Sequence, residues 1–216
     1  MKDKYTFGEC SLVIMDEVFG LRETFQSQVL NNWLNMAIPI SEEEAIMLKT
    51  IQKVLHANRN AWNEHELSLH FIGPMFSLVN FTEVYRFNLF SQRHISAKIP
   101  TQNGDITLGG EPDGIIATGY RAPKIPMFAF TEYKRQHNSD GDPVGQTLAA
   151  ALVGQVLNKE PIPIYGCYVI GDRWTFLVLD GKHYTTGTSC SAIEDDILDI
   201  FRILKALKSI IMDLTA

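Results

Sequence analysis

The sequence lacks any apolar run long enough to cross a bilayer, and it lacks the pattern of a secretory leader. No segment of its 216 residues approaches the roughly 18 uninterrupted apolar residues of a membrane span. The charged stretch from Met1 to Glu9 is followed by neither a long apolar core nor a small-residue cleavage site. We therefore expect no membrane partner and an intracellular, cytoplasmic location.

Cysteine is scarce as well, and two common catalytic loops are missing. Cys10, Cys167 and Cys190 are odd in number and widely spaced, which excludes a full disulfide framework and a Cys-x-x-Cys metal knuckle. No Gly-Lys-Ser/Thr follows the glycine-rich segment 104–114, and the chain has no Gly-x-Ser-x-Gly elbow. Spare or buried thiols are expected, and neither a nucleotide P-loop nor an α/β-hydrolase site.

The chain also has too few basic residues for a general polyanion binder. Nineteen Lys and Arg against 25 Asp and Glu give a net charge of −6, whereas phosphate contacts need clustered cations. A group of site carboxylates that binds cations would add to this negative sum. Any nucleic-acid groove must therefore be local.

No repeat, low-complexity tract or linker divides the sequence, which predicts a single domain over 1–216. Helical patterns dominate the first third, where the Ser41–Glu44 capping box opens an amphipathic run, and 1–58 is predicted as a helical N-terminal extension. Residues 59–186 form the predicted core. Residues 187–216 form a C-terminal helix opened by a second capping box at Ser191–Glu194.

Within the core, a helix over about 60–72 should kink or restart at Gly73-Pro74. Apolar and polar residues then alternate in the manner of strands, and an Ala-rich helix is predicted over 144–157. The predicted strands are 85–89, 95–99, 106–108, 115–117, 125–134, 164–170, 174–179 and 183–185. This order of helix, hairpins, helix, meander and helix predicts the α/β (α+β) class.

Glu132 and Lys134 are the first residues to suggest chemistry. On a strand both point to one face while Tyr133 points to the other. An isolated Glu-x-Lys is usually an ion pair at the surface. Here, however, the pair ends the apolar run 128–130, where charges without a role would be costly to bury.

Pro112-Asp113 opens another short strand 19 residues before Glu132. Together these positions read Pro112-Asp113 … Glu132-Tyr133-Lys134, which resembles the motif of the PD-(D/E)XK nuclease superfamily. The resemblance implies a restriction-endonuclease-like core, with a central mixed β-sheet flanked by helices. The segment 165–176 is similar to the strand-turn-strand of the nuclease domain of type I restriction subunits, so the likeness spans about 63–184.

Two further positions match the family pattern. The family carries a Glu on a preceding helix, and Glu64 is preferred to Glu66 for this role. It also carries a Gln on the helix after the Lys, for which Gln146 is the first choice and Gln155 the spare candidate. Nine residues separate the two glutamines, which places them half a turn apart on a helix, so only one can face the site.

The resemblance implies a metal-dependent nuclease, an endonuclease-type hydrolase that uses Mg²⁺ or Mn²⁺ and acts on DNA in restriction, repair or a mobile element. Asp113, Glu132 and Glu64 would hold the metal, Lys134 would stabilise the charge on the phosphate, and Gln146 would align water or substrate. The alternative is a non-catalytic nuclease-fold module that binds a protein or a nucleic acid. DNA or RNA, endo- or exonuclease action, and a protein partner or homo-oligomer stay open.

Overall fold

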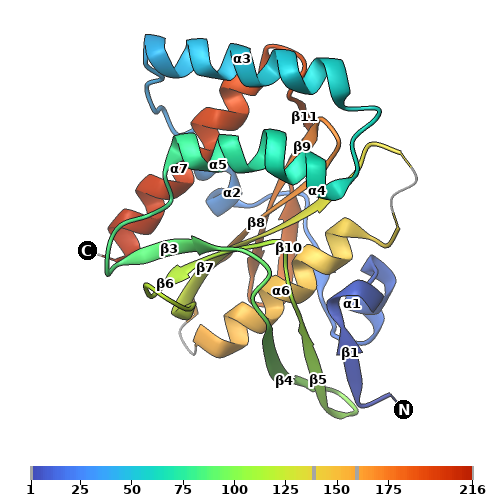
Figure 1. Ribbon diagram of the computed structural model, residues 1–216. Coiled ribbons are helices and arrows are strands. Elements are labelled where there is room, and N and C mark those ends of the chain that lie inside the picture. The colour runs from blue at the N-terminus through green and yellow to red at the C-terminus, as the bar shows by residue number, and fades with distance from the viewer. Residues whose placement is uncertain (1, 138–139, 159–160, 216) are drawn as a thin grey trace.

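The computed structural model describes residues 2–137, 140–158 and 161–215 and places two sheets among helices (Figure 1). The larger sheet has the order β2-β10-β9-β8-β7-β6-β3, with β11 paired to β9, and the smaller has the order β1-β5-β4. The larger sheet consists of β2 (Arg22–Glu23), β3 (Phe87–Phe90), β6 (Gly114–Thr118), β7 (Lys124–Lys134), β8 (Ile164–Ile170), β9 (Arg173–Asp180), β10 (His183–Thr186) and β11 (Cys190–Ser191). The smaller consists of β1 (Lys4–Thr6), β4 (Ile95–Thr101) and β5 (Gly104–Gly110).

The larger sheet is mixed. Strand β7 pairs antiparallel with β6 and parallel with β8, and the crossover between β7 and β8 contains α6 (Pro143–Asn158). A parallel pair needs such a crossover, whereas the antiparallel strands β8, β9 and β10 are joined by short turns. The α/β class, with a mixed sheet flanked by helices, is thus confirmed.

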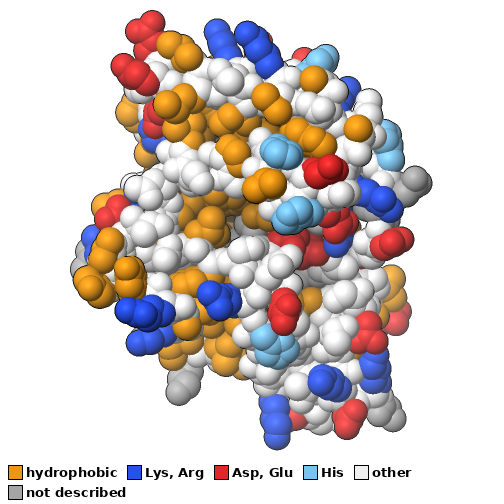
Figure 2. Space-filling model, in the orientation of Figure 1, with side chains coloured by type: hydrophobic (Ala, Val, Ile, Leu, Met, Phe, Trp, Pro, Cys, Tyr) orange, Lys and Arg blue, Asp and Glu red, His pale blue; other side chains and the backbone are white. Residues whose placement is uncertain are grey.

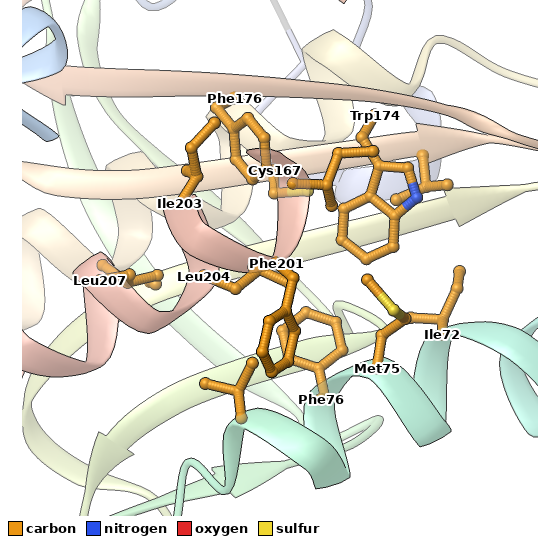
Figure 3. Close-up of a cluster of buried hydrophobic side chains, with 14 of the residues drawn as sticks. Ile72, Met75, Phe76, Cys167, Trp174, Phe176, Phe201, Ile203, Leu204 and Leu207 are labelled. Atoms are coloured by element: carbon orange, nitrogen blue, oxygen red, sulfur yellow. The ribbon is translucent and has the colours of Figure 1, made fainter. Parts of the chain in front are cut away.

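Helices cover both faces of the larger sheet (Figure 1). The remaining helical elements are η1 (Phe7–Glu9), α1 (Leu12–Glu17), α2 (Gln28–Leu34), α3 (Glu42–Asn58), α4 (Glu64–Leu67), the π-helical turn η2 (Ser68–Ile72), α5 (Gly73–Val79) and α7 (Asp196–Leu214). On one face, Phe76 of α5 and Phe201 of α7 pack with Trp174 of β9 (Figure 3). On the other face lies α6, whose segment 148–153 is wholly buried. None of the helices in the described ranges is long and apolar enough to cross a membrane.

Helix α6 lies close to β7 because the helix has small residues at the contact. A Cβ on Gly154 would overlap the ring of Phe130. The N-terminus of α6 is capped by Asp142, whose Oδ1 accepts the backbone N–H groups of Val144 and Gly145 at 3.0 and 3.1 Å. This packing fixes the direction of α6 beside the C-terminal end of β7.

The long central strand and the Ala-rich helix match their predicted positions, and the Ser41 capping box opens α3. The predicted restart at Gly73-Pro74 takes the form of η2, in which the backbone widens before α5 begins. Such a turn is one way for a helix to continue past a proline, which has no N–H to donate.

Three predictions need correction. The first third of the chain is not wholly helical, because β1 pairs with β5 and β2 pairs with β10, which ties both segments into the sheets. The C-terminal helix begins at Asp196, since Ser191 belongs to β11 and donates its hydroxyl to Asp172. Strand β3 begins at Phe87, because Tyr85 has a left-handed φ of 67° and so lies outside the strand.

Candidate metal and hydrolase site

The C-terminal end of β7 presents two charged side chains on one face of the sheet. Glu132 and Lys134 point to the α6 face, and Tyr133 points into the core on the other, as strand alternation requires. The side chains of Glu132 and Lys134 are only 12% and 11% exposed. They are joined by an ion pair of 2.9 Å between Lys134 Nζ and Glu132 Oε1.

Asp113 is the residue just before the neighbouring strand β6, and its side chain lies close to the end of β7. The β6–β7 ladder ends at the pair Gly114–Thr131, so β6 offers no further backbone acceptor to β7. Asp113 Oδ2 replaces the missing backbone acceptor and accepts the backbone N–H of Tyr133 at 2.7 Å. The carboxylate therefore continues the strand pairing and is held beside Glu132.

The residues around Asp113 restrict its backbone further. Its carbonyl oxygen accepts the hydroxyl of Ser91 at 2.9 Å, and the carbonyl of Pro112 accepts the backbone N–H of Gln92 at 3.2 Å. Gly114 must be glycine, because a Cβ there would overlap Thr131 Oγ1. These contacts set the direction of the Asp113 carboxylate through the loop that joins β3 to β4.

Glu64 lies at the start of α4 and at the edge of the group. Its Oε1 is 4.0 Å from Lys134 Nζ, and its side chain is half exposed. Among the described residues, no three Asp, Glu, His or Cys side chains come together closely enough to hold a metal. The expected ligand set of Asp113, Glu132 and Glu64 is therefore not assembled as one group of three, since Glu64 faces Lys134 from the solvent side.

The pKa values of Glu132 and Asp113 are both raised, first by burial. Burial, and next the charge of Asp113, raise the pKa of Glu132 to about 7, against the opposing effect of Lys134. Burial also raises the pKa of Asp113, although the N–H of Tyr133 and the charge of Lys134 oppose the rise. At neutral pH this pair resists full ionisation, and a bound cation would relieve the repulsion.

The pKa of Lys134 is also raised, which for a lysine favours the charged form. Burial disfavours its ammonium form, but the neighbouring carboxylates, Glu132 first, outweigh that effect and raise its pKa. Lys134 is therefore a fixed cation near neutral pH. A role as a general base would need a lowered pKa, so the geometry favours a role in stabilising negative charge.

The two candidate glutamines of α6 lie where their helical spacing predicts. Gln146 is 6% exposed and lines the same pocket as Glu132 and Lys134. Its side-chain amide makes no hydrogen bond within the described ranges. Gln155 lies on another side of α6 and donates from Nε2 to the carbonyl of Gly181 at 2.9 Å.

The pocket has a volume of about 510 Å³ and lies between the end of β7, the start of α6 and the smaller sheet. Figure 2 shows Asp and Glu side chains gathered with a Lys or Arg near the middle of this face, with His side chains nearby. The wall that the smaller sheet contributes to this pocket was not predicted from the sequence. The wall residues are Lys4, Thr6, Phe7, Gly8, His94, Ser96, Thr107, Gly109, Gly110 and Glu111.

The donor set suits a hard divalent ion. Asp113 and Glu132 supply carboxylate oxygens, which Mg²⁺ and Mn²⁺ prefer, with no thiolate or imidazole among the candidate ligands. Mg²⁺ commonly uses one or two carboxylates and keeps several waters, so a pair of carboxylates is a sufficient protein contribution. The residues present thus fit such an ion.

The sequence matches no protein-family model and no curated protein.

Proposed function

We propose that this protein is a metal-dependent nuclease of the PD-(D/E)XK type, with a restriction-endonuclease-like core, that hydrolyses phosphodiester bonds of DNA. One observation carries the proposal. The carboxylate of Asp113, the residue just before β6, lies beside that of Glu132 on the neighbouring strand β7, and the ammonium of Lys134 is 2.9 Å from Glu132. The order of elements supports it, since α6 connects the motif strand β7 to the parallel strand β8.

Asp113 and Glu132 would hold Mg²⁺ or Mn²⁺, which supplies a Lewis acid and lowers the pKa of bound water. Hydrolysis joins a water oxygen to phosphorus and breaks the bond from phosphorus to the leaving sugar oxygen. The water loses a proton and the leaving oxygen gains one. Negative charge grows on the phosphoryl oxygens in between.

Lys134 would stabilise that charge, because its pKa is raised and its ammonium stays protonated. Lys134 is paired with Glu132 at 2.9 Å, and with Glu132 as a metal ligand its ammonium would be available to the phosphate. Gln146 is 6% exposed, lines the same pocket, and its amide makes no hydrogen bond within the described ranges. It would orient the attacking water or a phosphate oxygen.

Cleavage of DNA by purified protein tests the proposal. We expect Mg²⁺ or Mn²⁺ to support nicking of supercoiled plasmid and cutting of a labelled single strand, and EDTA to stop both. Asp113→Ala should abolish cleavage. Asp213→Ala, which removes an exposed carboxylate near the end of α7, should cut like the wild type, and equal activity in both variants would point to a contaminating nuclease.

A non-catalytic nuclease-fold module is the second candidate, for a specific reason. The Glu132–Lys134 pair satisfies both charges without a metal, and the chain carries a net charge of −6. If no divalent ion supports cleavage and none changes the thermal stability, the carboxylates serve as structural partners of Lys134. A binding role for the fold would then replace catalysis.

A further inference from the structure

The smaller sheet has one apolar and one polar face. Ile99, Ile106 and Leu108 are buried in the core that includes α6. The alternate residues point the other way and, apart from Pro100 opposite Asp105 at the hairpin end, are polar or glycine. We call this side the outer face, and it consists of Lys4, Thr6, Ser96, Lys98, Thr107 and Gly109.

The strand register arranges the outer face in two rows. Lys4 pairs with Thr107, which pairs with Lys98, so a hydroxyl stands between two ammonium groups. In the next row Gly109 lies between Thr6 and Ser96. A Cβ on Gly109 would overlap the side chain of Ser96. Neighbouring strands are about 4.8 Å apart, so the two lysines stand about 10 Å apart across β5.

Both lysines are free to bind an external anion. Within the described part of the chain, neither Lys4 nor Lys98 has a carboxylate within 4.0 Å, whereas Lys2, Lys134 and Lys205 are paired. Asp105 shares the outer face at its hairpin end. Two unpaired ammonium groups on an acidic chain form the local basic surface that phosphate binding requires.

The pocket connects the outer face to the candidate site. Thr6, Ser96 and Thr107 line it together with Glu132, Lys134 and Gln146, and Glu111 also borders it. Its volume of about 510 Å³ lies in the range that takes a drug-sized molecule, about 300–1,000 Å³. This space suits one or two nucleotides of a strand, but not the width of a base-paired duplex.

We propose that the outer face binds the sugar-phosphate backbone of a single nucleic-acid strand and leads it to Asp113 and Glu132. Lys4 and Lys98 contact phosphates, and the hydroxyls of Ser96 and Thr107 donate to phosphate oxygens, whereas the Thr6 hydroxyl already donates to Glu9 Oε2 at 2.9 Å. As a substrate track this rests on the proposed nuclease function. As a binding surface it can be measured without cleavage.

Binding of a fluorescently labelled 12-nucleotide single strand tests this, in the Asp113→Asn background so that the strand stays intact. The double variant Lys4→Gln/Lys98→Gln is compared with Lys49→Gln/Lys53→Gln, which removes the same charge from two exposed positions of α3. For single strands, the logarithm of the binding constant falls linearly with the logarithm of the salt concentration, and each phosphate contact adds about 0.7 to the steepness of this slope. We therefore expect the first variant to reduce the slope by about 1.4 and to weaken binding about 25-fold at 0.1 M salt.

The control variant should bind like the background protein, and a duplex of the same sequence should bind more weakly than the single strand. Equal affinities of the two double variants would overturn the proposed surface, as would a preference for the duplex or no binding by the background protein. If the outer face binds as expected but wild-type protein cleaves no nucleic acid with any divalent ion, the nuclease function fails and the binding surface stands.

Discussion

The carboxylate of Asp113 accepts the backbone N–H of Tyr133 at 2.7 Å, at the point where the β6–β7 ladder has ended. The same side chain thus has a structural task and a proposed task in metal binding. The two tasks can be told apart by comparing a substitution of Asp113 that keeps the acceptor oxygen with one that removes it.

Asp113→Asn keeps an oxygen for the Tyr133 N–H and removes the charge that Glu132 repels. We expect its melting temperature without metal to equal or exceed that of the wild type, while cleavage is lost. Asp113→Ala leaves the N–H without its acceptor, which costs about 2 kcal/mol and lowers the melting temperature by about 4–8 °C. Differential scanning fluorimetry measures both, and a marked destabilisation by Asp113→Asn would mean that the charge itself is structural.

Divalent ions should stabilise the wild type and leave Asp113→Asn unchanged. A ligand that binds the native state alone adds about 2.7 kcal/mol at a hundred times its Kd. The melt is repeated over a series of Mg²⁺ and Mn²⁺ concentrations, with Ca²⁺ as a further hard ion. Equal shifts in the two proteins would place any bound metal away from Asp113.

The sequence predicted the elements whose pattern is local. Strand β7 is a long apolar run and α6 a run of small apolar residues, and both patterns are readable without the fold. The placement of Asp113 beside Glu132 followed from the motif spacing. The classification as a restriction-endonuclease-like core rests on that motif and stays a proposal.

The features that could not be predicted from the sequence are those fixed by contacts between segments that lie far apart in the chain. Strand β1 has three residues and is fixed by pairing with residues 107–109, so no local pattern marks it. Ser191 has the spacing of a capping box, yet its hydroxyl is taken by Asp172 in the turn between β8 and β9. The position of Glu64 depends on how α4 packs, which motif spacing cannot specify. The alternation of Lys4 and Thr6 around Tyr5 was the available signal for the outer face.

Gln146 and Gln155 provide a matched pair on one helix. Gln146→Ala removes an amide from the pocket lining, and we expect cleavage to slow by about 10- to 100-fold, as when residues that orient metal ligands are lost. Gln155→Ala removes a hydrogen bond to Gly181 and should leave the rate unchanged. Single-turnover rates at saturating metal make the comparison, and equal rates for the two variants would exclude Gln146 from the site.

Loss of the Asp172 side chain should have a large effect on stability, although Asp172 is not one of the candidate site residues. It is 2% exposed and accepts hydrogen bonds from Arg59 Nη1 at 3.0 Å and Ser191 Oγ at 2.9 Å, which ties α3 and β11 to the turn after β8. Asp172→Ala leaves both donors without this acceptor and should cost about 2–4 kcal/mol. Asp199→Ala removes an exposed partner of Arg202 and should change little. Urea unfolding measures the difference, and similar midpoints for both variants would contradict this role.

The raised pKa of Glu132 predicts how stability depends on pH. Its pKa is about 7 in the folded protein, against 4.5 for an unperturbed Glu. The pKa of Glu132 is higher in the folded protein than in the unfolded chain, so the folded state holds the proton more tightly. The stability that this proton contributes is complete below about pH 4.5 and is lost as the pH rises through 7. The loss is on the order of 3 kcal/mol.

Glu132→Gln stays neutral at every pH, so the stability that it gains over the wild type should grow between pH 4.5 and pH 8. Mg²⁺ at pH 8 should close the gap by stabilising the wild type alone, since the ionised carboxylate then faces a cation. Thermal melts of both proteins at the two pH values, with and without Mg²⁺, measure the gap. A gap that does not change with pH would mean that Lys134 alone keeps Glu132 ionised throughout, as in a purely structural ion pair.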